Sequence, residues 1–389
     1  MRSSLQEEAT ETENPIDMFP GWVGVMARCF LFLFMLLAPV LASAQSVDES
    51  LEAGFAALQK NDADRAATSF RRALAAEPDH PVALYGAGAA ATVLGRHTDA
   101  IAFLKRSLQI EPRLVQASIL LGEVAHHQGD LSFAIKTYEN ALKLAPGNNE
   151  LREKLAAWRS EATVHDNLRA FKDDRFTILF DGPANRVLAE RATTVLREAF
   201  WRIGQTLGSY PSNPINVILY TDKQFHDITG APEWAGGGFD GQIRMPVGGA
   251  AQNLREFDRI LTHELTHAML HSIASRNVPA WLHEGLAMYF EGNDPAVSEK
   301  RLVAARAFVP LANLQYGFSG LTSKQADLAY EMSAFAAGAL LTRLGQGNLR
   351  FLLQDLDRGL ELHVAIQRFS LTMADFEAQL AKRVSGRRP

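Results

Sequence analysis

Cysteine is almost absent from this sequence of 389 residues, and neither sign of charge dominates it. The single cysteine, Cys29, lies in an N-terminal segment that we expect to be removed. Disulfides and cysteine ligands are therefore excluded from the mature chain. The net charge of -5 is small for this length, which argues against a nucleic-acid partner or a polybasic membrane-surface protein. Hydrophobic residues make up 47% and charged residues 21%, values typical of a globular protein, and the length is enough for two or three domains.

The sequence also lacks an N-terminal hydrophobic run long enough to span a membrane comfortably. The apolar stretch from Cys29 to Leu41 is shorter than the roughly 20 residues that a membrane span needs. A basic residue precedes it and Ala42-Ser43-Ala44 follows, which is typical of a signal-peptide cleavage site. Residues 1–44 are thus expected to be a signal peptide with an N-terminal extension, whose true initiator is Met18 or Met26. The protein is then exported, to the periplasm or the exterior; an uncleaved membrane anchor is the alternative.

A period of 34 residues runs through the segment that follows. Glycine, alanine, a bulky residue and proline each recur in phase over three units: Gly54, Gly88, Gly122; Ala66, Ala100, Ala134; Phe70, Leu104, Tyr138; Pro78, Pro112, Pro146. Small residues let two helices pack closely, the bulky residue fills the gap, and proline ends the second helix. The pattern resembles the tetratricopeptide repeat family. The resemblance implies an α-solenoid of three helix-turn-helix units over 47–162, with Asn149–Ala162 as a capping helix.

The repeat array predicts a concave surface for a peptide or protein partner. The alternative is a spacer that binds nothing, because a fold by itself does not define a function.

The C-terminal half shows a mixed pattern of α and β structure. Strands are expected at Arg175–Phe180 and Ile215–Tyr220, with a helix between them. A glycine-rich loop then leads into a hairpin or edge strand at Phe239–Met245, which could bind an extended substrate by β-addition; the loop around Trp234 could instead form a lid. The predicted class is α+β, with a catalytic domain at 175–300 and a helical C-terminal lobe at 301–389.

Residues 253–274 predict a helix with one leucine face. His263 and His267 stand on successive turns of this helix, on the face opposite the leucines. This placement lets two imidazole nitrogens bind one Zn²⁺. Glu264 lies beside them, where it would polarise a water molecule rather than ligate. Pro279 then breaks the chain, and the next predicted helix carries Glu284, a candidate third ligand from a separate element.

These two helices resemble the gluzincin zinc peptidases. The resemblance rests on His263-Glu264-Leu265-Thr266-His267-Ala268 together with Trp281-Leu282-His283-Glu284-Gly285-Leu286-Ala287. It implies that His263, His267 and Glu284 bind Zn²⁺ and that Glu264 is the general base in hydrolysis of a peptide or protein. Tyr330, on a later helix, is the implied donor to the developing oxyanion, with Ser333 a weaker candidate.

The remaining histidines leave alternatives open. His271 is expected to support a ligand or to face solvent, because a fourth protein ligand would close the site. His283 is expected to be exposed or to pack, and it is the substitute ligand if Glu284 is misassigned. Ordinary structural or surface roles are expected for His165, His226 and His363. The alternative function is an envelope interaction scaffold with an inactive peptidase-like domain; a weaker one is zinc-dependent hydrolysis of a bond other than a peptide.

Overall fold

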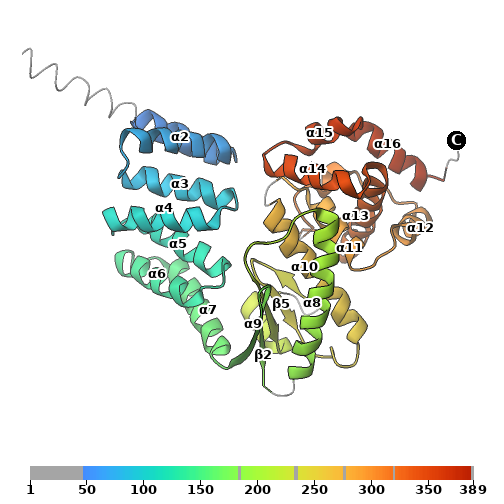
Figure 1. Ribbon diagram of the computed structural model, residues 1–389, viewed down its shortest axis with the longest axis horizontal. Coiled ribbons are helices and arrows are strands. Elements are labelled where there is room, and N and C mark those ends of the chain that lie inside the picture. The colour runs from blue at the N-terminus through green and yellow to red at the C-terminus, as the bar shows by residue number, and fades with distance from the viewer. Residues whose placement is uncertain (1–46, 183–184, 232–234, 275–276, 319, 387–389) are drawn as a thin grey trace, which may run out of the picture.

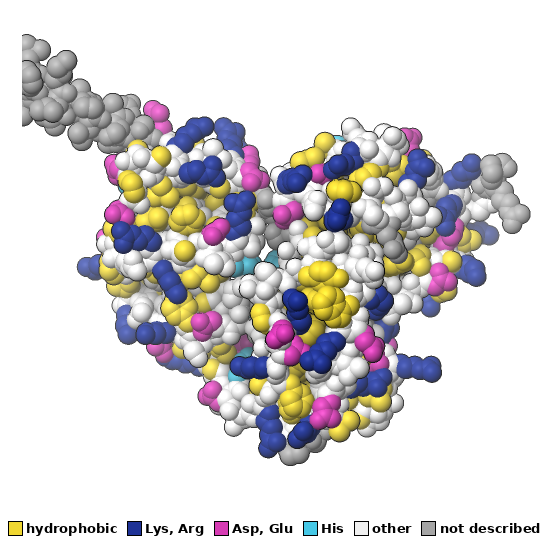
Figure 2. All heavy atoms as spheres, in the orientation of Figure 1, with side chains coloured by type: hydrophobic (Ala, Val, Ile, Leu, Met, Phe, Trp, Pro, Cys, Tyr) yellow, Lys and Arg dark blue, Asp and Glu magenta, His cyan; other side chains and the backbone are white. Residues whose placement is uncertain are grey.

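The computed structural model describes residues 47–182, 185–231, 235–274, 277–318 and 320–386. The expected signal peptide and Trp234 lie outside these ranges. Two arms form a V: a stack of helices (blue to green) and the C-terminal half (yellow to red), joined at their base (Figure 1). The space-filling view shows histidine side chains (cyan) in the hollow between the arms (Figure 2). Within the described ranges, no helix is long and apolar enough to cross a membrane.

The first arm is the predicted α-solenoid. A helix at 47–59 precedes α2 (Ala63–Ala76), α3 (Pro81–Val93), α4 (His97–Ile110), α5 (Val115–His127), α6 (Leu131–Leu144) and α7 (Asn149–His165). The glycines and bulky residues that recur in phase pack against each other. A Cβ added at Gly54 would lie 2.6 Å from the Phe70 ring, one at Gly88 2.7 Å from the Leu104 side chain, and one at Gly122 2.4 Å from the Tyr138 ring. The period therefore records helix packing, because only glycine leaves room for the bulky partner.

A five-stranded mixed sheet opens the second arm. Its strands are β1 (Leu168–Lys172), β2 (Phe176–Asp181), β3 (Ile215–Tyr220), β4 (Gly238–Phe239) and β5 (Ile243–Pro246), in the order β1-β2-β3-β5-β4. The three inner strands are parallel, and the two outer strands pair antiparallel. Strand β1 was not foreseen, because its charged residues resemble a linker. The strand predicted at Phe239–Met245 is a hairpin whose first strand, β4, is an edge of the sheet.

Helices cover the sheet and complete the second arm. They are α8 (Arg186–Leu207), α9 (Asp222–Thr229), α10 (Leu254–Ile273), α11 (Ala280–Phe290), α12 (Pro295–Ala305), α13 (Ser323–Leu344), α14 (Gln346–Asp357), α15 (Leu362–Ala365) and α16 (Met373–Val384), with short 3₁₀ turns at Leu311–Leu314 and Ile366–Phe369. The leucine face of α10 is buried in the main core, where Leu261 and Leu265 are fully covered. The α+β class with a helical lobe is thus confirmed.

Close packing of α11 against α13 sets the position of the second predicted metal helix. A Cβ at Gly285 would lie 2.2 Å from the carbonyl oxygen of Ser333. Only glycine allows this approach. Because Gly285 follows Glu284 directly, the contact fixes the turn of α11 that carries the glutamate.

Candidate metal centre

Helices α10 and α11 bring His263, His267 and Glu284 together. One ligand atom from each lies within 4.8 Å of the others. The Oε2 atom of Glu284 is 3.4 Å from His263 Nε2 and 3.7 Å from His267 Nε2. Successive turns of one helix and a carboxylate from the next therefore point at a common position.

This donor set fits Zn²⁺. Two imidazoles and one carboxylate are a ligand combination of catalytic zinc sites, which keep a fourth position open. The surrounding charge agrees, since the carboxylates of Glu264 and Glu291 lie beside the ligands and Arg259 is the cation paired with Glu291. An excess of negative charge in a buried place favours a bound cation.

Glu291 contacts the His263 nitrogen that does not face Glu284. Its Oε2 atom is 2.8 Å from His263 Nδ1 and 2.7 Å from Arg259 Nη1. Burial lowers the pKa of His263, but contacts with Glu284 and Glu291 outweigh it and raise that pKa to about 10. A carboxylate on Nδ1 orients a ligating histidine and makes it more basic. Glu291 was not predicted from the sequence, although it lies two helical turns after Glu284 and so on the same face.

His283 packs against His267 and is not exposed. The two Nδ1 atoms are 2.7 Å apart, and the rings stack with centroids 4.7 Å apart. Burial lowers the pKa of His267 to about 3 and that of His283 to about 4, so both are neutral near pH 7. When His267 donates from Nδ1, its Nε2 keeps a lone pair facing Glu284. The His283 contact is therefore compatible with metal binding by His267 when His267 is the donor of this hydrogen bond.

Glu264 is nearly buried, at 7% exposure, next to the ligands. Burial, and then the charges of Glu284 and Glu291, raise its pKa to about 7. Gly237, just before β4, leaves the space beside it, because a Cβ there would lie 3.2 Å from Glu264 Cγ. The edge strand therefore starts next to this carboxyl.

Tyr330 and Ser333 differ in their relation to the site. Burial raises the pKa of Tyr330 to about 12, and the charges of Glu284 and Glu264 add to the effect, so the phenol lies within electrostatic reach of both carboxylates. Ser333 is fully buried and donates to the carbonyl of Ala329, 2.7 Å away. Its hydroxyl is therefore part of α13 and offers nothing to a substrate.

The other histidines lie elsewhere. His271 faces the repeat arm, next to His97 and His127, and not the ligands one turn before it. His165 Nε2 is 2.7 Å from the Tyr220 hydroxyl, and His226 Nδ1 is 3.0 Å from the Ala231 carbonyl oxygen, so both have structural contacts. His363 is exposed.

A buried ion pair connects the capping helix of the repeat arm to the sheet. Arg244 on β5 donates to Glu161 on α7 over 2.6 Å and to the Tyr220 hydroxyl over 2.8 Å. Glu161 also lies 2.9 Å from His126 Nε2. Burial raises the pKa of Glu161, but the hydrogen bond with His126 and the charge of Arg244 outweigh it and lower that pKa to about 2. The two arms are therefore joined by charged groups at their base.

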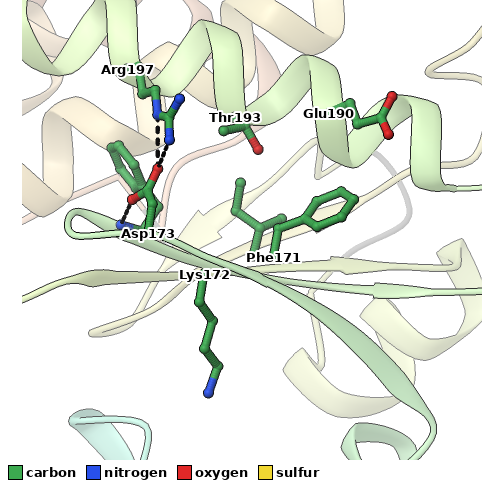
Figure 3. A pocket seen from close by; sticks show the side chains of 8 residues that line it. Phe171, Lys172, Asp173, Glu190, Thr193 and Arg197 are labelled. Atoms are coloured by element: carbon green, nitrogen blue, oxygen red, sulfur yellow. Dashed lines mark hydrogen bonds and ion pairs between the residues drawn. The ribbon is translucent and has the colours of Figure 1, made fainter.

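A hollow of about 310 Å³ between β1, β2 and α8 shares no residue with the metal ligands. Arg197 reaches from α8 to Asp173 at its edge (Figure 3), with Nε 2.8 Å from Oδ2. Asp173 also accepts from the backbone N–H groups of Arg175 and Phe176. Its contacts hold the β1–β2 turn to α8, which is a structural role.

Comparison with known families agrees with both arms. Residues 195–377 match the Peptidase MA superfamily, and residues 51–114 and 115–148 match the tetratricopeptide repeat. The chain thus carries a Peptidase MA superfamily domain after tetratricopeptide repeats. The repeat resemblance is confirmed, and that of the C-terminal half is confirmed at the level of the superfamily.

Curated relatives align with part of the chain. It is 28% identical over 123 residues to the Small glutamine-rich tetratricopeptide repeat-containing protein 2 of Mycosarcoma maydis, covering 31% of this chain and 35% of the relative. It is 27% identical over 180 residues to the Hsp70-Hsp90 organizing protein of Triticum aestivum, covering 43% of this chain and 31% of the relative. The chain thus spans about a third of the length of these relatives.

Similar solved structures include the Arabidopsis OM64 TPR domain, at 18% identity and a TM-score of 0.30, covering 31% of this chain and 98% of that one. MamA is similar at 20% identity and a TM-score of 0.30, with 39% and 89% covered.

Proposed function

We propose that this protein is an exported zinc-dependent peptidase. The observation that carries the proposal is the convergence of His263, His267 and Glu284 on one position, with the buried Glu264 beside them. The Peptidase MA superfamily match over 195–377 supports the same chemistry. Bound Zn²⁺ would lower the pKa of water and polarise the scissile carbonyl.

The side chains around the ligands divide the remaining work. Glu264, with its pKa near 7, accepts a proton from water and passes it to the leaving amine. Tyr330 keeps its proton at neutral pH, because its pKa is raised to about 12, and donates a hydrogen bond to the developing oxyanion. Glu291 and His283 keep the two imidazoles in the ligating orientation.

The substrate is an extended peptide that adds to the edge strand β4. This strand pairs on one side with β5 and is the last in the sheet, so its other edge offers backbone groups for β-addition. Gly237 places that edge next to Glu264. The repeat arm recruits a protein partner or the substrate itself, the usual use of a solenoid surface.

An envelope interaction scaffold with an inactive peptidase-like domain is the competing function. It has no use for a buried carboxyl of raised pKa beside three potential ligands. Holding Glu264 there costs free energy, because burial disfavours its charged form. That cost argues for the peptidase.

The test compares the purified mature chain with Glu264→Gln, measuring metal content and peptide cleavage. Both proteins are expected to hold zinc at His263, His267 and Glu284, while cleavage by the variant falls by about 10²- to 10⁴-fold. Glu198→Gln, an exposed position on α8, is the matched control and should cleave normally. Glu264-independent cleavage, or no cleavage of any peptide by a zinc-loaded chain, would favour the scaffold. Unchanged zinc content in Glu284→Ala would refute the third ligand.

A further inference from the structure

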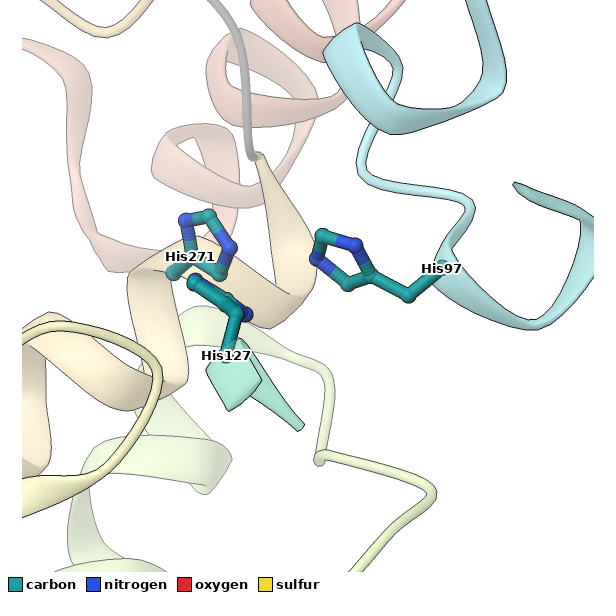
Figure 4. A group of neighbouring side chains, drawn as sticks. All are labelled: His97, His127 and His271. Atoms are coloured by element: carbon teal, nitrogen blue, oxygen red, sulfur yellow. The ribbon is translucent and has the colours of Figure 1, made fainter. Parts of the chain in front are cut away.

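Three histidines from distant parts of the chain meet between the two arms. His97 begins α4, His127 ends α5, and His271 lies on α10 one turn beyond His267. One ring nitrogen from each lies within 4.8 Å of the others. The ring centroids are 4.8 Å apart for His97 and His127, 5.4 Å for His127 and His271, and 6.0 Å for His97 and His271. Figure 4 shows the three rings gathered around one space.

Several of these nitrogens have no partner within the part of the chain that the structure describes. Both ring nitrogens of His97 and the Nε2 atom of His271 are buried without a hydrogen bond. His127 Nδ1 has only a long contact, 3.4 Å from Gln128 Nε2. Buried polar atoms are rarely left unpaired, because they have given up their water. One nitrogen of each ring lies close to one nitrogen of the other two, and a metal ion that accepts their lone pairs would supply the missing partner.

Tight backbone packing holds the group in place. A Cβ at Gly129, two residues after His127, would lie 2.3 Å from Asn216 Nδ2 on β3. A Cβ at Gly241, in the β4–β5 turn, would lie 2.4 Å from the carbonyl oxygen of His127. The turn of the third repeat is therefore seated directly on the sheet, and the arms do not meet by loose contact of side chains.

The chemistry of the group selects a class of ion. The three converging ligand atoms are all imidazole nitrogens, which suit Zn²⁺, Cu²⁺ or Ni²⁺ and not Mg²⁺ or Ca²⁺, because these prefer oxygen. Burial lowers the pKa of all three histidines, that of His127 to about 4, so they are neutral at physiological pH. Neutral imidazole is the form that binds a metal.

We propose that His97, His127 and His271 form a second metal site, for Zn²⁺, that clamps the second and third repeats to α10. A cavity of about 350 Å³ adjoins all three side chains and leaves a fourth position for water or another small ligand. The ion crosslinks three elements and fixes the last turn of the helix that also carries His263 and His267. The clamp goes beyond the proposed peptidase function and does not depend on it.

The test uses the full mature chain without an affinity tag, stripped with chelator and loaded with Zn²⁺. Metal is counted after dialysis in the wild type, in His263→Ala/His267→Ala, in His97→Ala/His127→Ala, and in the exposed control His363→Ala. We expect two ions in the wild type and the control, and one in each double variant. Zn²⁺ should also raise the melting temperature of the His263→Ala/His267→Ala variant. This rise should be absent when His97 or His127 is removed as well.

The two sites can fail separately. If the wild type binds one ion and His97→Ala/His127→Ala binds none, the clamp stands and the peptidase centre is wrong. If His263→Ala/His267→Ala binds no ion while circular dichroism shows it folded, and Zn²⁺ does not move its melting temperature, the clamp is overturned. One ion retained when His97 and His127 are also removed from that variant would likewise overturn it. Co²⁺ absorption of the His263→Ala/His267→Ala variant would report whether the second site is tetrahedral, and its loss on removal of His97 and His127 would assign the ligands.

Discussion

Two groups of histidines share α10 but differ in how closely carboxylates surround them. At the first, Glu284, Glu264 and Glu291 surround the imidazoles; contacts with Glu284 and Glu291 raise the pKa of His263 to about 10, while burial lowers that of His267 to about 3. At the second, burial and the neighbouring imidazoles of His97 and His271 lower the pKa of His127 to about 4, and the charge of Asp240 opposes them only in part. Ligand geometry alone therefore does not define the role of a metal. Carboxylates that can move protons suit catalysis, and neutral nitrogens shared by two domains suit a crosslink.

Adjacent turns of α10 offer the sharpest way to separate the groups. His267→Ala should remove the first ion and lower peptide cleavage by about a thousandfold or more, since a metal contributes several kcal/mol to such a transition state. His271→Ala should remove the second ion and leave the first in place. Metal counting and cleavage assays on both variants check this. Loss of the same ion in both would show that the two turns serve one site.

At the base of the molecule the two arms are joined by the Glu161–Arg244 ion pair, whereas the second histidine group joins them through neutral imidazoles. Glu161→Ala would leave Arg244 buried with Asp240 as its remaining acidic partner, so we expect a loss of about 3–5 kcal/mol in the free energy of unfolding. Asp227→Ala breaks an exposed pair with Lys223 and should change it little. Urea denaturation of both variants measures the difference. Equal midpoints would mean that Glu161 contributes nothing at the junction.

Acid should weaken the same junction. The pKa of Glu161 falls from an ordinary 4.5 to about 2 on folding, so the folded protein favours its ionised form. Its stabilising effect is complete above pH 4.5 and is lost as the pH falls towards 2. The difference in unfolding free energy between the wild type and Glu161→Gln should therefore shrink over that interval. A constant difference would place the effect of Glu161 in packing and not in charge.

Removal of the Tyr330 hydroxyl tests whether this residue takes part in catalysis at the first site. Tyr330→Phe should lower kcat by about 10²- to 10³-fold and leave zinc content unchanged, as expected for loss of one oxyanion donor. Tyr316→Phe, at a side chain that is 98% exposed, is the matched control. A Tyr330→Phe enzyme with normal kcat would make Tyr330 a structural tyrosine.

Sequence periodicity predicted the solenoid and the α10–α11 pair because both are local. The spacing of Gly54, Phe70 and their equivalents records contacts between neighbouring helices. His263 and Glu284 likewise come from helices that follow each other along the chain. Strand β1 escaped prediction, since it is short, carries the charged Arg169 and Lys172, and becomes a strand only by pairing with β2.

Contacts between the arms could not be predicted from the sequence, for a different reason. Nothing in the spacing of His97, His127 and His271 relates them, because the docking of the repeats on the sheet brings them together. His271 was therefore interpreted from its own helix alone, next to the ligands. The Glu161–Arg244 pair depends on the same docking. Glu291, in contrast, was within reach of helical periodicity, and its contribution can be measured.

Glu291→Ala should weaken zinc binding at the first site by about 10- to 100-fold and leave the second unchanged, because it removes the carboxylate that orients His263. Glu291→Gln keeps an acceptor for His263 Nδ1 but loses the charge that Arg259 contacts, so its loss should be smaller. Competition with a chromophoric chelator measures both affinities. Equal losses in the two variants would assign the effect to charge, and normal affinity in both would leave Glu291 a structural partner of Arg259. Glu291 contacts His263 and Arg259 at the first site, so any weakening at the second would mean that the two sites communicate through α10.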